Sequence, residues 1–390
     1  MNRKRTLAIV LAALFVAAAC TSTATTAPET QAPATAAPAT AAPATAAPAS
    51  GEATAAPTAA PSAPTGGGAT GLDVPIGDAS RSDQEYVWIS NASNLPLFVE
   101  RVYPGLESAK KALNVQVRVA GPSSVDLAAF IATVDTECTK GAAGDIQGVI
   151  VVGGWDDALA SEVDKCIDKK VPTVVTDGDL PMSKRLTYLG TDWYKFGRLH
   201  GQYQCQYHKE KGLTAGKIGT ISFLAAGNFI SARQGLRDQL AAECPEVQVV
   251  ADEESGTNVE QVAANTAAIL QAHPDLTGMV GMDSEAGPGI VRAIDEAGKA
   301  GKIIVTSNEA GREFMNAIKD GKALMINMEK YETMDFFAVL FLYTFHNDII
   351  RNLYMDQWLQ NPLPAIGDSG LIVVTKDNVD VILEATKPVE

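Results

Sequence analysis

The sequence predicts a doubly wound α/β fold in two lobes, and three observations support this. First, short apolar runs alternate with amphipathic stretches from residue 86 onward, as in strands followed by helices. Second, the apolar runs are rich in Val and Ile without interruption, as parallel strands covered on both faces require. Third, 390 residues exceed one domain and suit two lobes of about 150 residues each plus additional segments.

The predicted strands share this continuous apolar character and are 86–89, 115–119, 148–152, 173–175, 217–223, 247–250, 278–281, 302–306 and 371–374. The predicted helices lie between them at 97–113, 126–139, 157–169, 193–210, 232–243, 259–272, 288–296 and 312–319. Residues 336–343 are apolar on all sides, which favours a buried core helix over a surface that faces a partner. No apolar run from residue 86 onward approaches the length of a transmembrane helix.

The N-terminal segment carries targeting signals. Arg3, Lys4 and Arg5 precede an uncharged run over residues 7–19, which predicts a signal peptide over residues 1–20 and an exported protein. The small residues before Cys20 resemble the bacterial lipobox, although Ala17 stands where Leu is usual. We favour lipidation of Cys20 and membrane anchoring outside the cytoplasm, and ordinary cleavage after an Ala-x-Ala site is the alternative.

A biased segment follows at residues 21–80. It is dominated by Ala, Pro and Thr, with prolines of a Pro-Ala-Thr-Ala-Ala repeat at Pro33, Pro38, Pro43 and Pro48. Almost no large apolar side chains are present to offset the entropy of ordering the chain. We therefore predict a disordered linker between the anchor and the folded part.

The charge balance excludes one class of partner. Lys and Arg total 31 against 46 Asp and Glu, a net charge of −15, which opposes binding to a nucleic acid backbone. In doubly wound sheets, ligands bind beyond the carboxyl ends of the strands. The segments at those ends, rich in hydrogen-bonding groups and poor in cations, are 90–94, 153–156, 176–179, 225–228, 282–285 and 307–309. They suit hydroxyls or an amine.

Six short motifs carry a resemblance to a known family, and they are residues 94–98, 171–177, 190–192 followed by Gly197, 272–276, 283–287 and 321–322. With these motifs in order, residues 85–377 resemble the ribose-binding-like sugar-binding proteins of ABC importers, the type I periplasmic binding fold. The resemblance implies two lobes joined by three crossings, which close on one small ligand and deliver it to a permease. It implies lobe 1 at 81–190 and 330–365, lobe 2 at 191–329 and 366–390, no cofactor and no enzymatic reaction.

The resemblance and the strand ends together nominate ligand contacts at Asn91, Asn94, Phe98, Trp155, Asp177, Arg233, Asp283, Asn308 and Glu329. Leu97 and Thr257 stand where the ribose binders stack aromatic side chains, and Gly178 stands where they place an arginine. Their second-lobe arginine aligns with Ala232, one residue before Arg233. A pocket poor in arginine disfavours carboxylates and phosphates, so we expect a small sugar, polyol or amino sugar.

Each of three nominated residues has an ordinary structural alternative. Phe98 stacks on a sugar ring or packs into the first helix. Trp155, after two glycines, stacks on the ligand or covers the surface. Asp177 accepts bonds from hydroxyls or forms a turn before Gly178.

Four cysteines remain after Cys20, an even number in an oxidising compartment. In the winding of the family, Cys138 and Cys166 share a face of lobe 1, while Cys205 and Cys244 lie on successive helices at lobe 2. We favour these two pairings among the three possible, with free buried thiols as the alternative. His200 and His208 share a helix with Cys205 but lack an obvious fourth ligand, so we expect no metal.

Two other functions fit the same fold. A solute-sensing protein would use the closed lobes to present a surface to a receptor. A Rossmann-type oxidoreductase needs a Gly-x-Gly-x-x-Gly turn after the first strand, where residues 90–94 stand instead.

Overall fold

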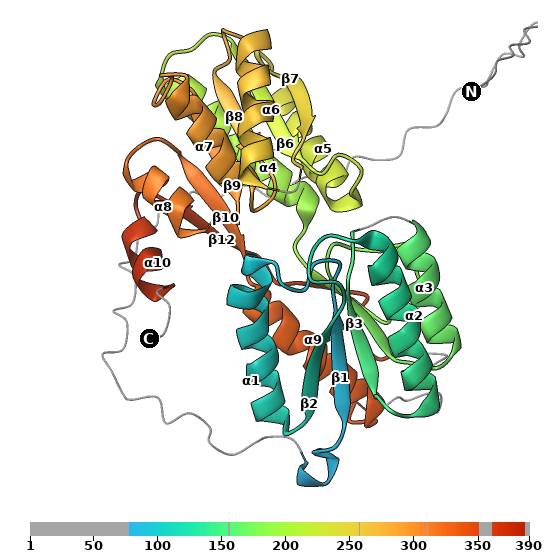
Figure 1. Cartoon of the computed structure of the whole chain (residues 1–390). Helices are drawn as coiled ribbons and strands as arrows, with labels where there is room; N and C mark the ends of the chain where they lie inside the picture. Colours follow the sequence, from blue (N-terminus) through green and yellow to red (C-terminus); the bar gives the residue numbers. More distant parts are fainter. Residues whose placement is uncertain (1–77, 155–156, 257, 310, 351–360, 387–390) are drawn as a thin grey trace, which may run out of the picture. The chain divides into compact units, whose positions relative to one another are not determined.

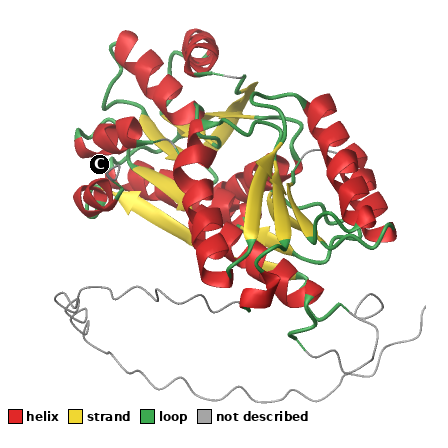
Figure 2. Ribbon diagram, turned by 60° about the horizontal axis from the view of Figure 1, so that its bottom comes forward, coloured by secondary structure: helices red, strands yellow, loops and turns green. Residues whose placement is uncertain are grey.

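The computed structural model describes residues 78–154, 157–256, 258–309, 311–350 and 361–386, which form two six-stranded sheets. The first sheet has the order β11-β5-β4-β3-β1-β2, and every neighbouring pair is parallel. The second has the order β12-β10-β9-β8-β6-β7 and is parallel except for β12 against β10. Figure 2 shows the strands of both sheets between helices. The predicted fold class is confirmed.

The strands of the first sheet are β1 (Glu85–Ile89), β2 (Gln116–Ala120), β3 (Gly148–Val152), β4 (Thr173–Asp177), β5 (Tyr188–Gly190) and β11 (Ile366–Asp368). Its helices are η1 (Ala79–Arg81), η2 (Phe98–Val102), α1 (Tyr103–Leu113), α2 (Leu127–Ala143), α3 (Asp157–Asp168) and α9 (Tyr331–His346). Alternate residues of β1 face opposite sides, because side chains along a strand alternate. Trp88 packs with α1 and α9, and Val87 packs with α2 and α3. Figure 1 labels these four helices around the sheet.

The strands of the second sheet are β6 (Gly216–Ser222), β7 (Val247–Glu254), β8 (Gly278–Gly281), β9 (Ile304–Asn308), β10 (Met325–Glu329) and β12 (Leu371–Thr375). Its helices are α4 (Trp193–Glu210), α5 (Gly227–Glu243), α6 (Val259–Ala272), α7 (Ala286–Glu296), α8 (Arg312–Lys319) and α10 (Val379–Ala385). Helices α4 and α5 cover one face, and α6, α7 and α8 cover the other. No helix in the described ranges is long and apolar enough to span a membrane.

The chain passes between the sheets three times, after β5, after β10 and after β11. The sequence analysis began the last part of lobe 2 at residue 366, and this boundary is wrong by a few residues. Ile366–Asp368 pairs with Tyr188–Gly190 in the first sheet, so the crossing comes at residues 369–370.

Other differences from the prediction have local causes. β5 and β11 have only three residues each, and β10 carries Asn327 and Glu329 among its apolar side chains, so none of them forms a continuous apolar run. The predicted helix over 97–113 starts as a π-helix and becomes α-helical near Pro104, which has no backbone N–H to donate. The apolar segment 336–343 belongs to α9, which buries Ala338 and Leu342 and leaves Phe337 42% exposed.

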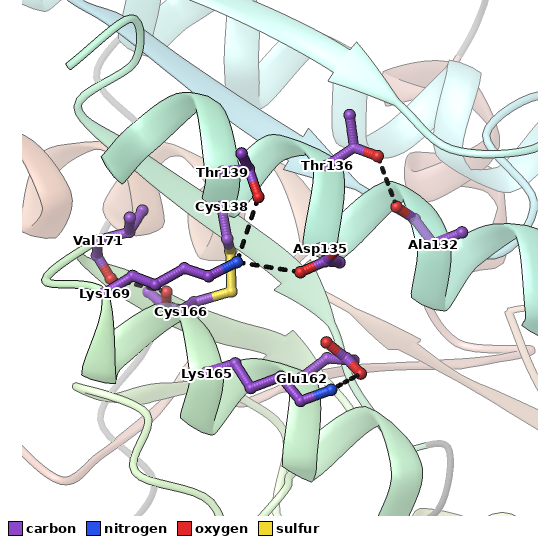
Figure 3. Close-up of a disulfide and its surroundings, with 11 residues drawn as sticks. Ala132, Asp135, Thr136, Cys138, Thr139, Glu162, Lys165, Cys166, Lys169 and Val171 are labelled. Atoms are coloured by element: carbon purple, nitrogen blue, oxygen red, sulfur yellow. Dashed lines mark hydrogen bonds and ion pairs between the residues drawn. A yellow bond between two sulfur atoms is a disulfide. The ribbon is translucent and has the colours of Figure 1, made fainter. Parts of the chain in front are cut away.

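Two disulfides link neighbouring helices, in the two pairings that the sequence analysis favoured. Cys138 on α2 joins Cys166 on α3 with the Cα atoms 5.2 Å apart (Figure 3). Cys205 on α4 joins Cys244 at the end of α5 with the Cα atoms 5.6 Å apart. Beside the first bridge, Lys169 Nζ lies 3.0 Å from Asp135 Oδ1, a second link between the same two helical segments. All four cysteines are buried.

We predict that each bridge forms in the exported protein and stabilises it by about 2 to 4 kcal/mol, chiefly by restricting the unfolded chain. Non-reducing peptide mapping should recover the peptides of Cys138 with Cys166 and of Cys205 with Cys244. Replacing both cysteines of one pair with Ala should lower the denaturation midpoint under oxidising conditions, and the reduced parent is the control. Four free thiols in the exported protein would contradict the prediction.

Candidate functional site

A cavity lies where the strand ends of the two sheets face each other. The cavity has a volume of about 120 Å³, counted over the positions that the centre of a water molecule can take. The lining residues that carry polar groups or rings are Asn91, Phe98, Asp177, Trp193, Phe223, Asn228, Phe229, Asp283, Ser284, Glu285, Asn308, Glu309 and Tyr331.

Asp283, which follows β8, is held by one carboxylate oxygen and leaves the other free. Its Oδ1 accepts bonds from Ser255 Oγ at 2.9 Å and from the backbone N–H groups of Glu285 and Ala286 at 3.2 and 3.1 Å. Its Oδ2 is buried without a hydrogen-bond partner in the described part of the chain, and the residue is 6% exposed. Burial raises the pKa of Asp283 to about 7, and the three donors lower it. Oδ2 is therefore a fixed acceptor beside the cavity.

Asp177, the last residue of β4, has the left-handed backbone φ of 67°, which is uncommon for a residue with a side chain. Two side chains hold this conformation, one from β5 before the first crossing and one from the start of α4 after it. Tyr188 Oη and Trp193 Nε1 donate to the Asp177 carbonyl at 2.6 and 3.0 Å. Burial raises the pKa of the Asp177 carboxyl to about 7. A strained, doubly held backbone at a strand end is characteristic of a functional position.

A second group of acids lies around the crossing after β10. Glu309 Oε1 accepts from the backbone N–H of Glu329, and Glu309 Oε2 lies 3.5 Å from Arg101 Nη1. Burial raises the pKa of Glu309 to about 8, although Arg101 lowers it. Glu329 accepts a bond from Tyr331 Oη at 2.8 Å, and burial together with the charge of Asp177 raises its pKa well above the usual range. Burial thus favours the protonated forms of the two carboxyls in this part of the site.

Amides complete the polar lining. Asn308 at the end of β9 is 3% exposed, and its Nδ2 donates to the Met282 carbonyl at 3.4 Å while its Oδ1 has no partner among the residues described. Asn228 at the start of α5 also has a buried Oδ1 without a partner among those residues. Asn91 follows β1 and is buried in the same lining. Amide groups of this kind both donate to and accept from hydroxyls.

Aromatic rings form the apolar part of the lining. Phe98 contacts Trp88 edge to face at 5.2 Å and Tyr331 at 6.4 Å between ring centres. From the other lobe, Phe229 contacts Trp193 edge to face at 5.2 Å. Such rings cover the apolar C–H faces of a ring-shaped ligand while the polar groups take its edges.

Some of the residues nominated from the sequence line the cavity, and others do not. Five of them line the cavity and are Asn91, Phe98, Asp177, Asp283 and Asn308. Phe98 both lines the cavity and packs into the core, so its two interpretations coexist. Trp155 and Thr257 lie outside the described residues, as does Cys20.

Three nominated residues lie outside the lining. Asn94 is exposed on the loop after β1. Arg233 donates to Ser222 Oγ and to the Leu224 carbonyl at 2.7 Å each, so its guanidinium holds the loop after β6. Glu329 is fully buried behind Tyr331 and Glu309.

The sequence analysis did not nominate Glu309, Trp193, Phe229 or Tyr331, which also line the cavity. Glu309 lies in segment 307–309, a strand end that was expected to face the ligand. Its position in the sequence could therefore have indicated it as a lining residue. Trp193 and Tyr331 come directly after two of the crossings, and only the fold reveals that these helix starts face the cavity.

The histidines of α4 have ordinary structural partners. His200 Nδ1 hydrogen-bonds with Thr306 Oγ1 at 2.8 Å, and His208 bonds with the Gln204 carbonyl and Thr277 Oγ1 at 2.7 and 2.8 Å. Cys205 is in a disulfide. Within the described ranges, no three His, Cys, Asp or Glu residues are placed to hold a metal ion.

Comparisons with known proteins agree with this architecture. A family model described as "Periplasmic binding protein domain" matches residues 86–343. A xylitol-binding protein of Mycolicibacterium smegmatis is 24% identical over 325 residues, 81% of this chain and 86% of that protein. An ABC transporter periplasmic-binding protein of Escherichia coli, YphF, is 23% identical over 57% of this chain and 68% of its own length.

Solved structures show the same fold. A glucose-galactose binding protein from Geobacillus stearothermophilus superposes with a TM-score of 0.66 at 21% identity, covering 76% of this chain and 98% of that one. A carbohydrate transporter solute binding protein from Agrobacterium radiobacter in complex with D-arabinose gives 0.68 at 20% identity, covering 78% and 98%.

We predict that the buried carboxyls make the protein less stable as the pH rises. Burial holds the pKa of Glu309 at about 8 when folded, above its value near 4.5 when unfolded, so its contribution is present below pH 4.5 and is lost as the pH rises toward 8. Glu309→Gln should gain stability relative to the parent between pH 4 and 8, by on the order of a few kcal/mol.

The measurement is thermal unfolding of both proteins at several pH values. The difference between them isolates Glu309 from His200, whose pKa burial lowers to about 3 and whose effect has the opposite sign. A difference that stays constant from pH 4 to 8 would show that the Glu309 pKa is not raised.

Proposed function

The chain belongs to the periplasmic binding protein family, and we propose that it is the extracytoplasmic solute-binding protein of an ABC importer. It binds a small sugar or polyol between its lobes and delivers it to a permease. The observation that carries this proposal is the cavity lined by strand ends of both sheets, with fixed acceptors from each. Relatives named for xylitol and for sugars support the ligand class.

The geometry suits a polyhydroxylated ligand. Asp177 from one lobe, Asp283 from the other and the free Oδ1 of Asn308 accept bonds from hydroxyls, and the amide of Asn91 donates to a hydroxyl oxygen. The aromatic rings cover the C–H groups between them. Because the groups come from both lobes, a ligand between them favours the conformation in which the lobes approach each other. We expect the bound compound to be recovered unchanged.

The decisive variant is Asp283→Ala. An ionised acceptor bonded to a hydroxyl contributes roughly 1.5 to 3 kcal/mol, so the substitution should weaken binding by about tenfold to a hundredfold. Calorimetry against a panel of pentoses, hexoses, inositols and amino sugars first identifies the ligand, and then measures the variant. Unchanged far-UV circular dichroism shows that the fold is intact.

Two asparagines on the same loop provide a matched pair. Asn91→Ala should weaken binding, since Asn91 lines the cavity, whereas Asn94→Ala should not, since Asn94 is exposed outside it. The proposal fails if only carboxylates or phosphates bind, if the compound is consumed over time, or if Asp283→Ala binds as tightly as the parent.

We further propose that Cys20 is lipidated and anchors the mature protein to the outer face of the membrane. The small residues before Cys20 and the proline-rich segment after it support this, because such a segment gives the binding lobes reach from an anchor.

Cys20→Ser should move the protein from the membrane fraction to the soluble fraction, because the modification needs the thiol. Fractionation followed by immunoblotting measures this. Thr30→Ser, a conservative change ten residues after the cysteine, is the control and should fractionate like the parent. A Cys20→Ser protein that stays with the membrane would rule out the lipid anchor.

A further inference from the structure

The charged side chains around the cavity are all acidic. Asp177, Asp283, Glu285 and Glu309 contribute carboxyls to the lining, and none of the described lining residues is Lys, Arg or His. The acids come from both lobes, at the ends of β4, β8 and β9. The lining therefore brings four carboxyls together without a cation among the described lining residues, and a positively charged group placed between them would favour their ionised forms.

Asp283 is the carboxyl of the lining with one oxygen held and the other free. Three donors fix its Oδ1, and Oδ2 is buried without a partner in the described part of the chain, in a residue that is 6% exposed. An ionised oxygen that is removed from water and lacks a donor is costly. A ligand group that donates a hydrogen bond and also carries positive charge satisfies both the bond and the charge.

The nearest guanidinium does not balance the charge. Arg101 lies 3.5 Å from Glu309 Oε2, and it also donates to the Glu329 carbonyl at 3.1 Å and to Glu332 Oε1 at 3.2 Å. It is thus shared among several oxygens on one side of the cavity. No interaction of Arg101 with Asp283 or Asp177 is present, and those carboxyls remain without a cation in the described structure.

The amides and aromatic rings of the lining indicate which further groups a fitting ligand would carry. The buried amides of Asn91, Asn228 and Asn308 fit hydroxyls, and the rings of Phe98 and Trp193 fit C–H faces. A carboxylate on the ligand would lie among four carboxyls and meet no cation among the described lining residues, which disfavours an amino acid.

We propose that the ligand is an amino sugar or an amine-bearing polyol that binds as its ammonium ion, with Asp283 as its main counter-ion. This inference rests on the proposed function and narrows its ligand class. An ammonium supplies three donors and one positive charge, whereas the hydroxyl it replaces supplies one donor and no charge.

Matched neutral and amine compounds test the proposal. Calorimetry at pH 6.5 compares D-glucose with D-glucosamine and N-acetyl-D-glucosamine, the corresponding galacto compounds, and D-glucitol with 1-amino-1-deoxy-D-glucitol. In the set that binds best, the amine should bind at least about tenfold more tightly than both its neutral parent and its acetamide. A neutral compound that binds as tightly as its amine partner, or more tightly, overturns the inference and leaves sugar binding intact. If no compound of either kind binds, the proposed function fails as well.

A second comparison assigns the counter-ion. Asp283→Asn keeps the size of the side chain and removes its charge, so it should reduce the preference for the amine at least about tenfold while changing affinity for the neutral partner less. Asp320→Asn removes the same charge from an exposed position in the same lobe and should leave the preference unchanged. Equal loss of affinity for both partners in Asp283→Asn would show that Asp283 acts only as a hydrogen-bond acceptor.

Discussion

The burial of carboxyls at the ends of parallel strands is the constraint on which the rest of this structure depends. Asp177 and Asp283 stand at the ends of β4 and β8, where burial raises the pKa of each to about 7. Carboxyls in this state favour neutral forms and oppose folding once they ionise. The two sheets must therefore be stable enough to carry them, and two disulfides and continuous apolar strands supply that stability.

The site is held by its backbone as much as by its side chains. Tyr188 and Trp193 both donate to the Asp177 carbonyl, so the strand before the first crossing and the helix after it fix one left-handed residue between them. A change in the first crossing would move these donors relative to Asp177. The position of this acceptor is thus coupled to the segment where the two lobes are joined.

The sequence predicted the architecture because each long element has one dominant signal. Buried strands such as Gly148–Val152 are uninterrupted apolar runs, and α4 keeps the same bounds in both descriptions. A short strand such as Tyr188–Gly190, or a strand with polar side chains such as Met325–Glu329, lacks that signal. Its pairing is imposed by neighbouring strands, some of them distant in the sequence. The missed elements flank the crossings, which explains why the boundary at residue 366 was displaced.

The same distinction applies to the site. Strand-end residues such as Asp177, Asp283 and Asn308 were found because the family resemblance and the position of strand ends at the ligand both indicated them. Arg233 was nominated from alignment to a family arginine, and no local signal indicates that its guanidinium turns to Ser222 and Leu224. Tyr331 begins α9 on the far side of a crossing, so only the three-dimensional fold brings it to Phe98.

These placements make the absence of a cation in the described lining the most informative feature of the cavity. Arg233, the one cation nominated for the site, does not line the cavity, and its guanidinium donates to Ser222 and Leu224 instead. With that guanidinium bonded to the loop after β6, no described lining residue offers a cation to the free Oδ2 of Asp283. Burial without such a cation raises the pKa of Asp283 to about 7, and a positively charged group on the ligand would favour its ionised form.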